Sequence, residues 1–284
     1  MSVDETHTES LFSFQAGGEC YRIQIANTRE LREKAFRLMY DIYEDIEYGH
    51  THPTRMWYSL YELLPDSVTV MVLHGEEAVA TVTVVNDSPF ALPDDVNYSE
   101  EMDRERANGR KLSQIISLGV RTDVRGAGMV LVRMFNFAYF VARGISGATD
   151  FINTVIPRHA PFYYKKLLFE PMGEVRYQPK TGVEVALIKL DFDEAEHEAH
   201  AEHGLFGAGA ETRHTLYKQF NSVQERPDIV EALRNEIRPV TEEDLVYFLG
   251  KKPELWRKTP SDQRVYFELL TEWSRQAHRE VHAA

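Results

Sequence analysis

A strand, a glycine-containing loop and a long apolar helix in the middle of the chain constrain the fold more than any other feature. The apolar, β-branched run at 112–120 predicts a buried strand, and Gly126 and Gly128 separate it from an apolar stretch at 129–143. A membrane-spanning helix needs about 20 apolar residues, whereas this stretch is shorter and contains Arg133. We therefore expect a helix that is buried in the core of a globular domain.

Hydrophobic periodicity predicts further elements on both sides of this segment. Helices are expected at 29–48, 56–64 and 157–168, and strands at 21–25, 68–73, 79–85, 149–156, 173–177 and 183–190. The polar region 86–111 contains two prolines and is expected to form an excursion on the surface. The order of the elements predicts an α/β fold, in which a mixed central sheet has helices on both faces.

Composition divides the chain into four parts. Residues 1–19 are expected to form a flexible N-terminal arm, and residues 20–191 carry the α/β unit. Residues 192–209 are acidic and rich in His, Ala and Gly, which is typical of a linker. The remaining part, 210–284, predicts an all-helical C-terminal extension, with helices near 211–222, 227–237, 241–249 and 261–281. Packing of these helices against the same chain is the default expectation, and association of two chains is the alternative.

Charge is distributed unevenly along the 284 residues, whose formal net charge is −13. Residues 104–180 carry a net charge of +8, whereas 1–103 carry −14 and 181–284 carry −7. The acidic whole argues against a nucleic-acid-binding protein. The basic block predicts contact with an acidic partner or ligand, and the alternative is that it pairs with the acidic flanks inside one domain.

Cysteine and histidine usage limits the classes of site. Cys20 is the single cysteine, so the chain has no internal disulfide and no four-cysteine zinc site. The segment from His197 to His203 has several possible ligands, but a solvated acidic helix is the favoured interpretation, and we expect no metal. Since the first residues are polar and acidic where a signal peptide would be basic and then apolar, we expect a cytoplasmic protein without a membrane span.

The loop before the apolar helix has features of a phosphate site. Glycines leave backbone N–H groups open to a ligand, and a helix N-terminus favours negative charge. The alternative is an ordinary turn with glycines for tight packing. With the order of elements, Arg125, Gly126, Ala127 and Gly128 resemble the Arg/Gln-x-x-Gly-x-Gly/Ala pyrophosphate loop of the GNAT superfamily of N-acyltransferases. Val130 stands where that loop has a small residue, which fits the single phosphate of an acyl carrier protein better than the pyrophosphate of coenzyme A.

A second block makes the resemblance narrower. The segment Pro157–Pro171, which reads PRHAPFYYKKLLFEP, is similar to the Pro-Arg-His-x-x-Phe-Tyr segment of long-chain N-acyl amino acid synthases. Those enzymes are related to acyl-homoserine-lactone synthases. The helix segment Arg37–Tyr43 resembles their Arg-x-x-Tyr-x-x-Tyr/Phe signature, and Asp66 matches an acidic position. The resemblance extends over about residues 21–191.

Three positions depart from that family. Leu168 replaces a glycine, Ile156 replaces an asparagine, and Gln114 stands where a glutamate is common. An amide cannot serve as a general base at neutral pH. Deprotonation of the amine would then fall to water, His159 or a backbone carbonyl, or catalysis would be impaired; alternatively Gln114 only satisfies its neighbours in the sheet.

The resemblance implies roles for further residues. Tyr163 would be the general acid that protonates the leaving thiolate. Tyr164 beside it is an alternative general acid, and the alternative role for Tyr163 is a structural one at the rim of the core. His159 would relay a proton or, more simply, cap the helix. The thioester carbonyl would be polarised by the backbone N–H groups of Leu118, Gly119 and Val120.

Basic residues complete the implied site. Arg37 and Arg158 are candidates to hold the carboxylate of an amino acid, because a guanidinium matches a carboxylate bidentately; surface ion pairing is the alternative for each. Lys165 and Lys166 are candidates for docking a carrier protein, with Arg125 and the glycine loop binding the pantetheine phosphate.

The function implied is an enzyme that moves a long acyl group from an acyl carrier protein thioester to the α-amine of an amino acid, without a tightly bound cofactor. The C-terminal helices could then also cover the acyl chain. Three alternatives stay open: an acyl-coenzyme-A-dependent acetyltransferase of a small amine, an acyl-homoserine-lactone synthase, and a catalytically degenerate GNAT fold that serves as a binding or regulatory module.

Overall fold

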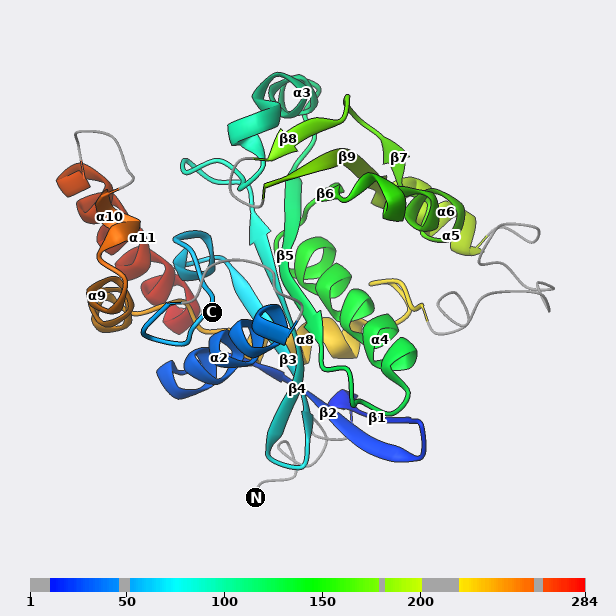
Figure 1. Ribbon diagram of the computed structural model, residues 1–284, viewed down its shortest axis with the longest axis horizontal. Helices are drawn as coiled ribbons and strands as arrows, with labels where there is room; N and C mark the ends of the chain where they lie inside the picture. Colours follow the sequence, from blue (N-terminus) through cyan, green and yellow to red (C-terminus); the bar gives the residue numbers. More distant parts are fainter. Residues whose placement is uncertain (1–10, 46–51, 179–181, 201–219, 258–262, 284) are drawn as a thin grey trace.

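The fold is built on one nine-stranded sheet (Figure 1). The computed structural model describes residues 11–45, 52–178, 182–200, 220–257 and 263–283. The strands are β1 (Ser13–Ala16), β2 (Glu19–Ile25), β3 (Val68–His74), β4 (Glu77–Asn86), β5 (Leu112–Val120), β6 (Asp150–Val155), β7 (Glu170–Pro171), β8 (Arg176–Gln178) and β9 (Val183–Asp191). Their order is β1-β2-β3-β4-β5-β6-β9-β7, and β8 also pairs with β9.

The pairing of the strands is antiparallel with one exception. Among the described strands, β5 and β6 alone run parallel, and they do so in the middle of the sheet. A parallel pair requires a crossover connection, which is supplied here by α4 (Ala127–Tyr139) and the π-helical turn η2 (Phe140–Ile145). The mixed α/β architecture expected from the sequence is therefore confirmed.

Helices cover both faces of the sheet. On one face lies α2 (Arg29–Asp45), and on the other lies α4 (Figure 1). Among the described residues, Ala127–Ile145 is the one stretch long and apolar enough to cross a membrane, but more than half of its most apolar window is buried. This burial agrees with the helix that the sequence predicted at 129–143 in the core. Its apolar side chains share a core with the sheet and with residues 229–233 of the C-terminal part.

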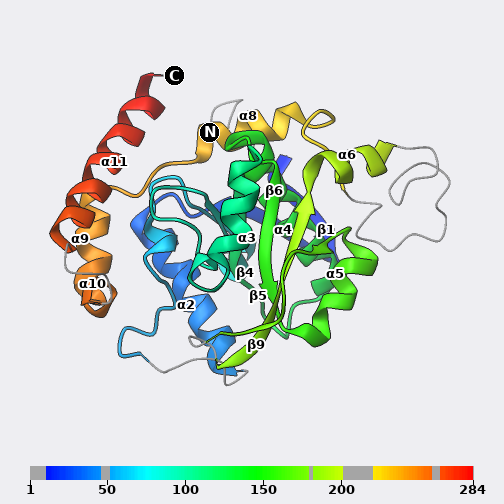
Figure 2. The same ribbon diagram turned by 90° about the horizontal axis from the view of Figure 1, so that it is seen from above.

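The remaining helices are short or lie at the ends of the sheet. They are η1 (Tyr61–Leu63), α3 (Asp95–Ala107), η3 (Pro157–His159), α5 (Ala160–Lys166), α6 (Phe192–His200), α8 (Pro227–Glu236), α9 (Glu242–Lys251), α10 (Glu254–Arg257) and α11 (Gln263–Ala283). Viewed from above, α9, α10 and α11 lie on the α2 side, and α5 and α6 lie on the opposite side (Figure 2).

The C-terminal helices take part in the cores of the sheet. Phe248 of α9 packs edge-on against Phe36 of α2, with ring centroids 5.4 Å apart, and Tyr58 donates a hydrogen bond to the Phe248 carbonyl at 2.8 Å. On the other face, a Cβ at Gly144 would lie 2.8 Å from the Val230 side chain of α8. The helices therefore close both cores.

Three segments differ from the sequence expectations. The flexible arm expected at 1–19 is wrong for 13–19, because Ser13–Ala16 pairs with β2 in a hairpin; residues 1–10 lie outside the described residues. The linker expected at 192–209 begins with helix α6, because the Phe192 side chain is buried and its ring packs against Phe151 at 4.8 Å. Residues 201–219, which include most of the helix expected at 211–222, lie outside the described residues.

Two expectations for the region before β5 also need correction. The surface excursion at 86–111 contains helix α3, because Tyr98 and Met102 are fully buried and the Tyr98 hydroxyl donates to the Val185 carbonyl at 2.9 Å. The helix expected at 56–64 shrinks to the single turn η1. Before this turn, the Ser59 N–H and hydroxyl donate to the Glu62 side chain, so Ser59 is bonded to a side chain and not to the carbonyl of a preceding helical turn.

Candidate active site

The central feature of the site is a bulge in β5. Opposite this strand the register shifts, since Thr81 pairs with Gly119 and Thr83 pairs with Ile116. Ser117 lies in the bulge with a φ of 49°, a left-handed conformation that costs a non-glycine residue about 1 kcal/mol. Its hydroxyl donates a hydrogen bond to Glu62 Oε1 at 2.7 Å, and this contact holds the strained residue in place.

The Glu62 carboxylate is almost completely buried, with 4% of the residue exposed. Its second oxygen, Oε2, accepts hydrogen bonds from the backbone N–H of Ser59 at 2.8 Å and from the Ser59 hydroxyl at 2.5 Å. Sequence reasoning missed Glu62. The available signal was the Ser-x-x-Glu spacing of Ser59 and Glu62, which is typical of a capping box, but that pattern gives no hint of contact with Ser117.

Just before the bulge, β5 separates from β6. The ladder between them contains the pairs Leu112–Asp150, Ser113–Phe151 and Gln114–Ile152 and no further pair among the described residues. Asn153 Nδ2 then donates to the Ile115 carbonyl at 2.7 Å, and Asn153 Oδ1 is buried with no hydrogen-bond partner in the described part of the chain. The open segment of β5 begins here and includes Leu118, Gly119 and Val120.

Tyr163 lies on α5, on the α4 side of the sheet. Its ring packs edge-on against Phe169 at 5.5 Å and belongs to the core that also contains Leu118 and Val120. Burial raises the pKa of Tyr163 above its usual value, and it raises the pKa of Tyr164 as well. A phenol with a raised pKa keeps its proton at neutral pH, which suits a group that must donate one.

Gln114 has a structural place in the sheet. It is 3% exposed, and it lies inside the β5–β6 ladder. Its Oε1 accepts the backbone N–H of Asp94 at 3.2 Å, and its Nε2 donates to Asp94 Oδ2 at 2.7 Å. Both ends of the amide are therefore engaged, although the partner is Asp94 at the start of α3 and not a neighbour in the sheet.

His159 and Arg158 lie together on the exposed turn η3. Arg158 Nε donates to His159 Nε2 at 3.3 Å. His159 precedes α5, but its side chain makes no capping hydrogen bond, so the expected cap is wrong. The physical reason is that His159 already has helical backbone angles in η3 and its N–H donates to the Ile156 carbonyl, so it lies inside the helical turn and does not precede it.

Arg37 is not near Arg158. It forms an (i, i+4) ion pair with Glu33 at 3.3 Å on the exposed side of α2, and Glu33 also accepts the Tyr247 hydroxyl of α9. Arg158 lies on η3, between β6 and α5, and α5 packs on the core that contains α4. The two arginines expected to hold one carboxylate are thus on different faces, and Arg37 has the surface ion pair named as its alternative.

The glycine loop packs against the β1–β2 turn. Gly126 has a φ of 67° and Gly17 a φ of 59°, and a Cβ at Gly126 would lie 2.6 Å from the Gly17 nitrogen. The Tyr21 hydroxyl donates to the Arg125 carbonyl at 2.9 Å. Gly126 is therefore required for close packing, whereas a Cβ at Gly128 would meet nothing within 4 Å. Ala127 and Gly128 form the first turn of α4.

Most arginines of the basic block are neutralised by the acidic flanks. Pairs join Arg106 to Asp87 and Asp95, Arg110 to Asp150 and Asp191, Arg121 to Glu77, Arg143 to Glu196 and Arg176 to Glu101. Arg125 is largely exposed but pairs with Glu19 at 3.2 Å. Arg158 and Lys165 are exposed and have no carboxylate partner in the described part of the chain, and the Lys166 side chain lies outside it. The block therefore mostly pairs within the fold.

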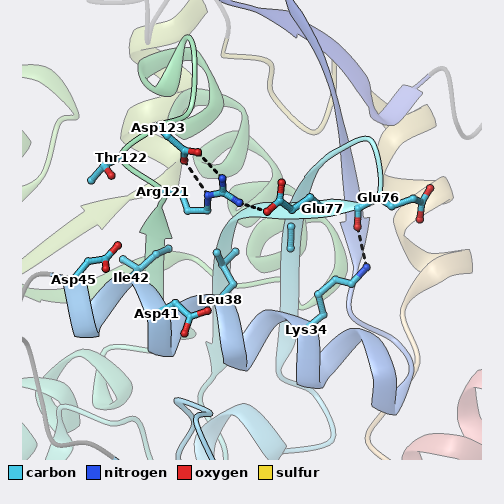
Figure 3. Close-up of a pocket in the computed structure, with 11 residues that line it drawn as sticks. Lys34, Leu38, Asp41, Ile42, Asp45, Glu76, Glu77, Arg121, Thr122 and Asp123 are labelled. Carbon is cyan, nitrogen blue, oxygen red and sulfur yellow. Dashed lines mark hydrogen bonds and ion pairs between the residues drawn. The ribbon is translucent and has the colours of Figure 1, made fainter.

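A pocket of about 700 Å³ lies between α2, the β3–β4 turn and the end of β5 (Figure 3). Leu38 and Ile42 form its apolar side, and a Cβ at Gly119 would lie 3.0 Å from Ile42. Carboxylates dominate its lining: Asp41, Asp45, Glu76, Glu77 and Asp123. Arg121 is held by Glu77 and Asp123, and Lys34 donates to the Glu76 carbonyl at 3.0 Å. Since three distant segments form this pocket, no local sequence pattern reveals it.

No group of three or more metal-binding side chains exists among the described residues, and His203 lies outside them.

Comparison with known proteins gives a consistent result. The family model of N-acyl amino acid synthase FeeM matches residues 34–191. The structure of FeeM, from uncultured soil microbes, is similar with a TM-score of 0.54 and 19% identity over 61% of this chain and 93% of that one, so the two share a fold. The coenzyme-A-dependent acyl-homoserine lactone synthase BjaI matches with a TM-score of 0.45 and 18% identity over 60% and 83%. No curated protein matches the chain.

Proposed function

Because the chain belongs to the family of N-acyl amino acid synthase FeeM and is an N-acyltransferase with a GNAT fold, we propose that it transfers a long-chain acyl group from acyl carrier protein to the α-amine of an amino acid. The observation that carries this proposal is the open segment of β5. Beyond Ile115 it has no ladder partner on its β6 side among the described residues, so backbone N–H groups are available at the centre of the fold.

In the proposed reaction, donor and acceptor approach β5 from opposite faces. The thioester carbonyl would accept hydrogen bonds from the backbone N–H groups of Leu118 and Val120, which stabilise the developing oxyanion. Gly119, expected from the sequence to take part, pairs with Thr81 of β4, so its N–H points to the other side of the strand. The amine would arrive from the α2 face, where the pocket lies. Tyr163, on the α4 side, would protonate the departing thiolate, which its raised pKa supports.

A carrier protein is proposed as the donor because the glycine loop offers a small cradle. Gly126 is committed to its contact with Gly17, and Val130 is completely buried. The N–H groups at the start of α4, at Ala127 and Gly128, then remain for one phosphate. The exposed Arg158 and Lys165 supply positive charge on the neighbouring η3–α5 segment for an acidic carrier.

The pocket beside α2 supports an amine as acceptor. Its carboxylates attract an ammonium group, and Lys34 is the lining cation whose charge is not paired with a carboxylate in the described part of the chain. Lys34 rather than Arg37 is therefore proposed to meet the carboxylate of the amino acid, because Arg37 faces Glu33 and Tyr247.

One experiment separates the proposal from its competitors. The purified protein is incubated with palmitoyl-loaded acyl carrier protein or palmitoyl-coenzyme A, a mixture of amino acids and S-adenosylmethionine, and extracted lipids are identified by mass spectrometry. Acyl amino acids formed from the carrier support the proposal. Product from coenzyme A alone favours the acyl-coenzyme-A alternative, an acyl lactone favours lactone synthesis, and carrier binding without any product favours the degenerate binding module.

A further inference from the structure

We propose that Ser117 and Glu62 form the proton-accepting pair on the amine side of the reaction, with Ser117 as the catalytic residue and Glu62 as its positioning residue. The inference rests on the proposed function, because it assigns the proton that an amine loses when it becomes an amide. It starts from a side-chain arrangement that the acyl-transfer steps above leave unused.

The bulge places the Ser117 hydroxyl at the open segment of β5. Ser117 is half-buried, three residues beyond the end of the β5–β6 ladder at Gln114. Its left-handed φ of 49° is unfavourable for serine and persists because surrounding contacts hold it. Gly119, two residues further along, lies against Ile42 of the pocket, and Leu63 and Leu64, which follow Glu62, pack in the core on the α2 face.

Glu62 is arranged to accept a proton through this hydroxyl. Three donors hold its carboxylate: the Ser117 hydroxyl on Oε1, and the N–H and hydroxyl of Ser59 on Oε2. None of these is a cation, and no Lys, Arg or His pairs with Glu62 in the described part of the chain. Because the Ser117 hydroxyl donates to the carboxylate, its lone pairs are free to accept from a substrate.

Other candidates for this proton are poorly placed. Gln114 is an amide whose two ends are both bound to Asp94. His159 is exposed and hydrogen-bonded to Arg158 on the far side of the sheet. In the described part of the chain, Glu62 is the carboxylate that is hydrogen-bonded to the open segment of β5. Water remains the alternative acceptor, and the test below separates the two.

The proposed step balances atoms and charge. The ammonium group of the amino acid first loses one proton to solvent water. The resulting amine nitrogen forms a bond to the thioester carbon, and its surplus proton passes to Ser117 Oγ while the Ser117 proton passes to Glu62 Oε1. The carbon–sulfur bond breaks, and the thiolate takes the Tyr163 proton. The products are an amide and a thiol; Glu62 then holds one extra proton and Tyr163 lacks one, and solvent water restores both.

The test compares variants of the pair with a matched serine on the same strand. Ser117→Gly removes the hydroxyl and relieves the left-handed strain, which offsets part of the cost of the lost hydrogen bond to Glu62, so the variant should still fold. We expect kcat to fall by about 100-fold with an unchanged KM for the amine, within the range of general base catalysis. Glu62→Gln should behave similarly. Ser113→Ala removes the buried hydroxyl bonded to Asn86 at 2.6 Å and should lower stability but leave kcat within about twofold.

The pH dependence distinguishes chemistry from structural damage. In Ser117→Gly and Glu62→Gln, kcat should rise about tenfold per pH unit from pH 7 to 9, because solvent hydroxide replaces the missing acceptor. A parent enzyme that makes product, together with variants that keep full kcat or lose it equally at every pH, would overturn the pair and favour water or a structural role. A parent enzyme that makes no product would instead overturn the proposed function.

Discussion

Gly17 and Gly126 are in backbone contact: a Cβ at Gly17 would lie 2.7 Å from the Gly126 nitrogen, and a Cβ at Gly126 would lie 2.6 Å from the Gly17 nitrogen. The turn of the β1–β2 hairpin therefore supports the loop that precedes α4. This contact joins a part of the chain expected to be a flexible arm to the loop expected to bind phosphate. It gives the loop a fixed position before any ligand arrives.

Gly17→Ala should lower the free energy of unfolding by about 2–4 kcal/mol, because the left-handed φ of 59° and the clash with Gly126 both oppose a Cβ. Gly75→Ala is the matched control. Gly75 has the same φ of 59° but nothing within 4 Å of its Cβ, so this variant should lose only about 1–2 kcal/mol. Urea unfolding of both variants measures the difference, and equal losses would contradict the contact.

Leu168 has a left-handed φ of 58°, a conformation that favours glycine, which is the residue that the family resemblance implies at this position. A left-handed conformation disfavours any residue with a Cβ by about 1 kcal/mol or more. Leu168→Gly should therefore be more stable than Leu168→Ala by about 1 kcal/mol, although both lose the packing of the leucine side chain. Thermal and urea unfolding of the two variants check the order. A more stable alanine variant would show that the turn relaxes when the leucine is removed.

Asp66 should make stability depend on pH. Burial, reinforced by nearby Asp87, raises the pKa of Asp66 to about 7, and its Oδ1 has no hydrogen-bond partner in the described part of the chain. A raised pKa means that the folded state binds the proton more tightly than the unfolded chain. The stabilisation is complete below the usual carboxyl pKa and is lost as the pH rises to about 7.

Asp66→Asn removes this titration. The stability of the variant relative to the parent should increase between about pH 4 and 7 and then stay constant, by an amount of up to about 4 kcal/mol for a shift of this size. Urea unfolding of both proteins at pH 5 and pH 8 measures it. A constant difference across that range would show that Asp66 titrates near its ordinary value.

Elements that carry a local pattern could be predicted from the sequence, and elements that depend on distant contacts could not. Helix α2 and strands β3 to β5 follow from periodicity, because their own side chains form the buried face. Helix α3 has little amphipathic character, and its burial comes from contacts such as that between Tyr98 and Val185, 87 residues apart. The surface excursion was therefore expected in its place.

The candidate site divides in the same way. Tyr163 and the glycine loop could be proposed from the sequence because each lies in a contiguous motif. Glu62 was missed because its partner Ser117 is 55 residues away, and the left-handed φ of Ser117 is set by pairing of β4 with β5 and not by local sequence. Likewise, Arg37 and Arg158 share a chemical type, but only the packing of α2 and η3 on different faces shows that they do not meet.

Asp244 should tie the C-terminal helices to the rest of the fold. It receives Arg32 Nη1 at 3.1 Å and Arg29 Nε at 2.7 Å, and the Arg32 and Asp244 side chains are only 6% and 8% exposed. Burial lowers the pKa of Arg32, and the Asp244 carboxylate opposes that change. Asp244→Asn leaves a buried guanidinium without a countercharge and should destabilise the protein by about 3–5 kcal/mol.

The exposed pair Arg275–Glu242, at 2.7 Å, is the control for this prediction. Glu242→Gln should change stability by less than about 1 kcal/mol. Guanidinium unfolding that shows one transition shifted by Asp244→Asn would agree with a shared core. A separate early transition confined to the C-terminal helices would contradict it.

Lys165 and Arg158 should separate carrier docking from catalysis. Both are exposed near Tyr163 and have no carboxylate partner in the described part of the chain, so an acidic carrier can approach them without breaking an ion pair. Lys165→Glu should lower kcat/KM for palmitoyl carrier protein by about tenfold at low salt, and the loss should shrink in about 0.5 M salt because the charges are then screened. With palmitoyl-pantetheine as the donor the rate should be unchanged. Arg279→Glu on α11 reverses an exposed charge far from α5 and should alter neither rate.

Arg158→Glu distinguishes carrier docking from binding of the acceptor. If Arg158 only docks the carrier, the KM for the amino acid stays constant with either donor. A raised KM for the amino acid with palmitoyl-pantetheine as the donor would instead place Arg158 on the carboxylate of the acceptor.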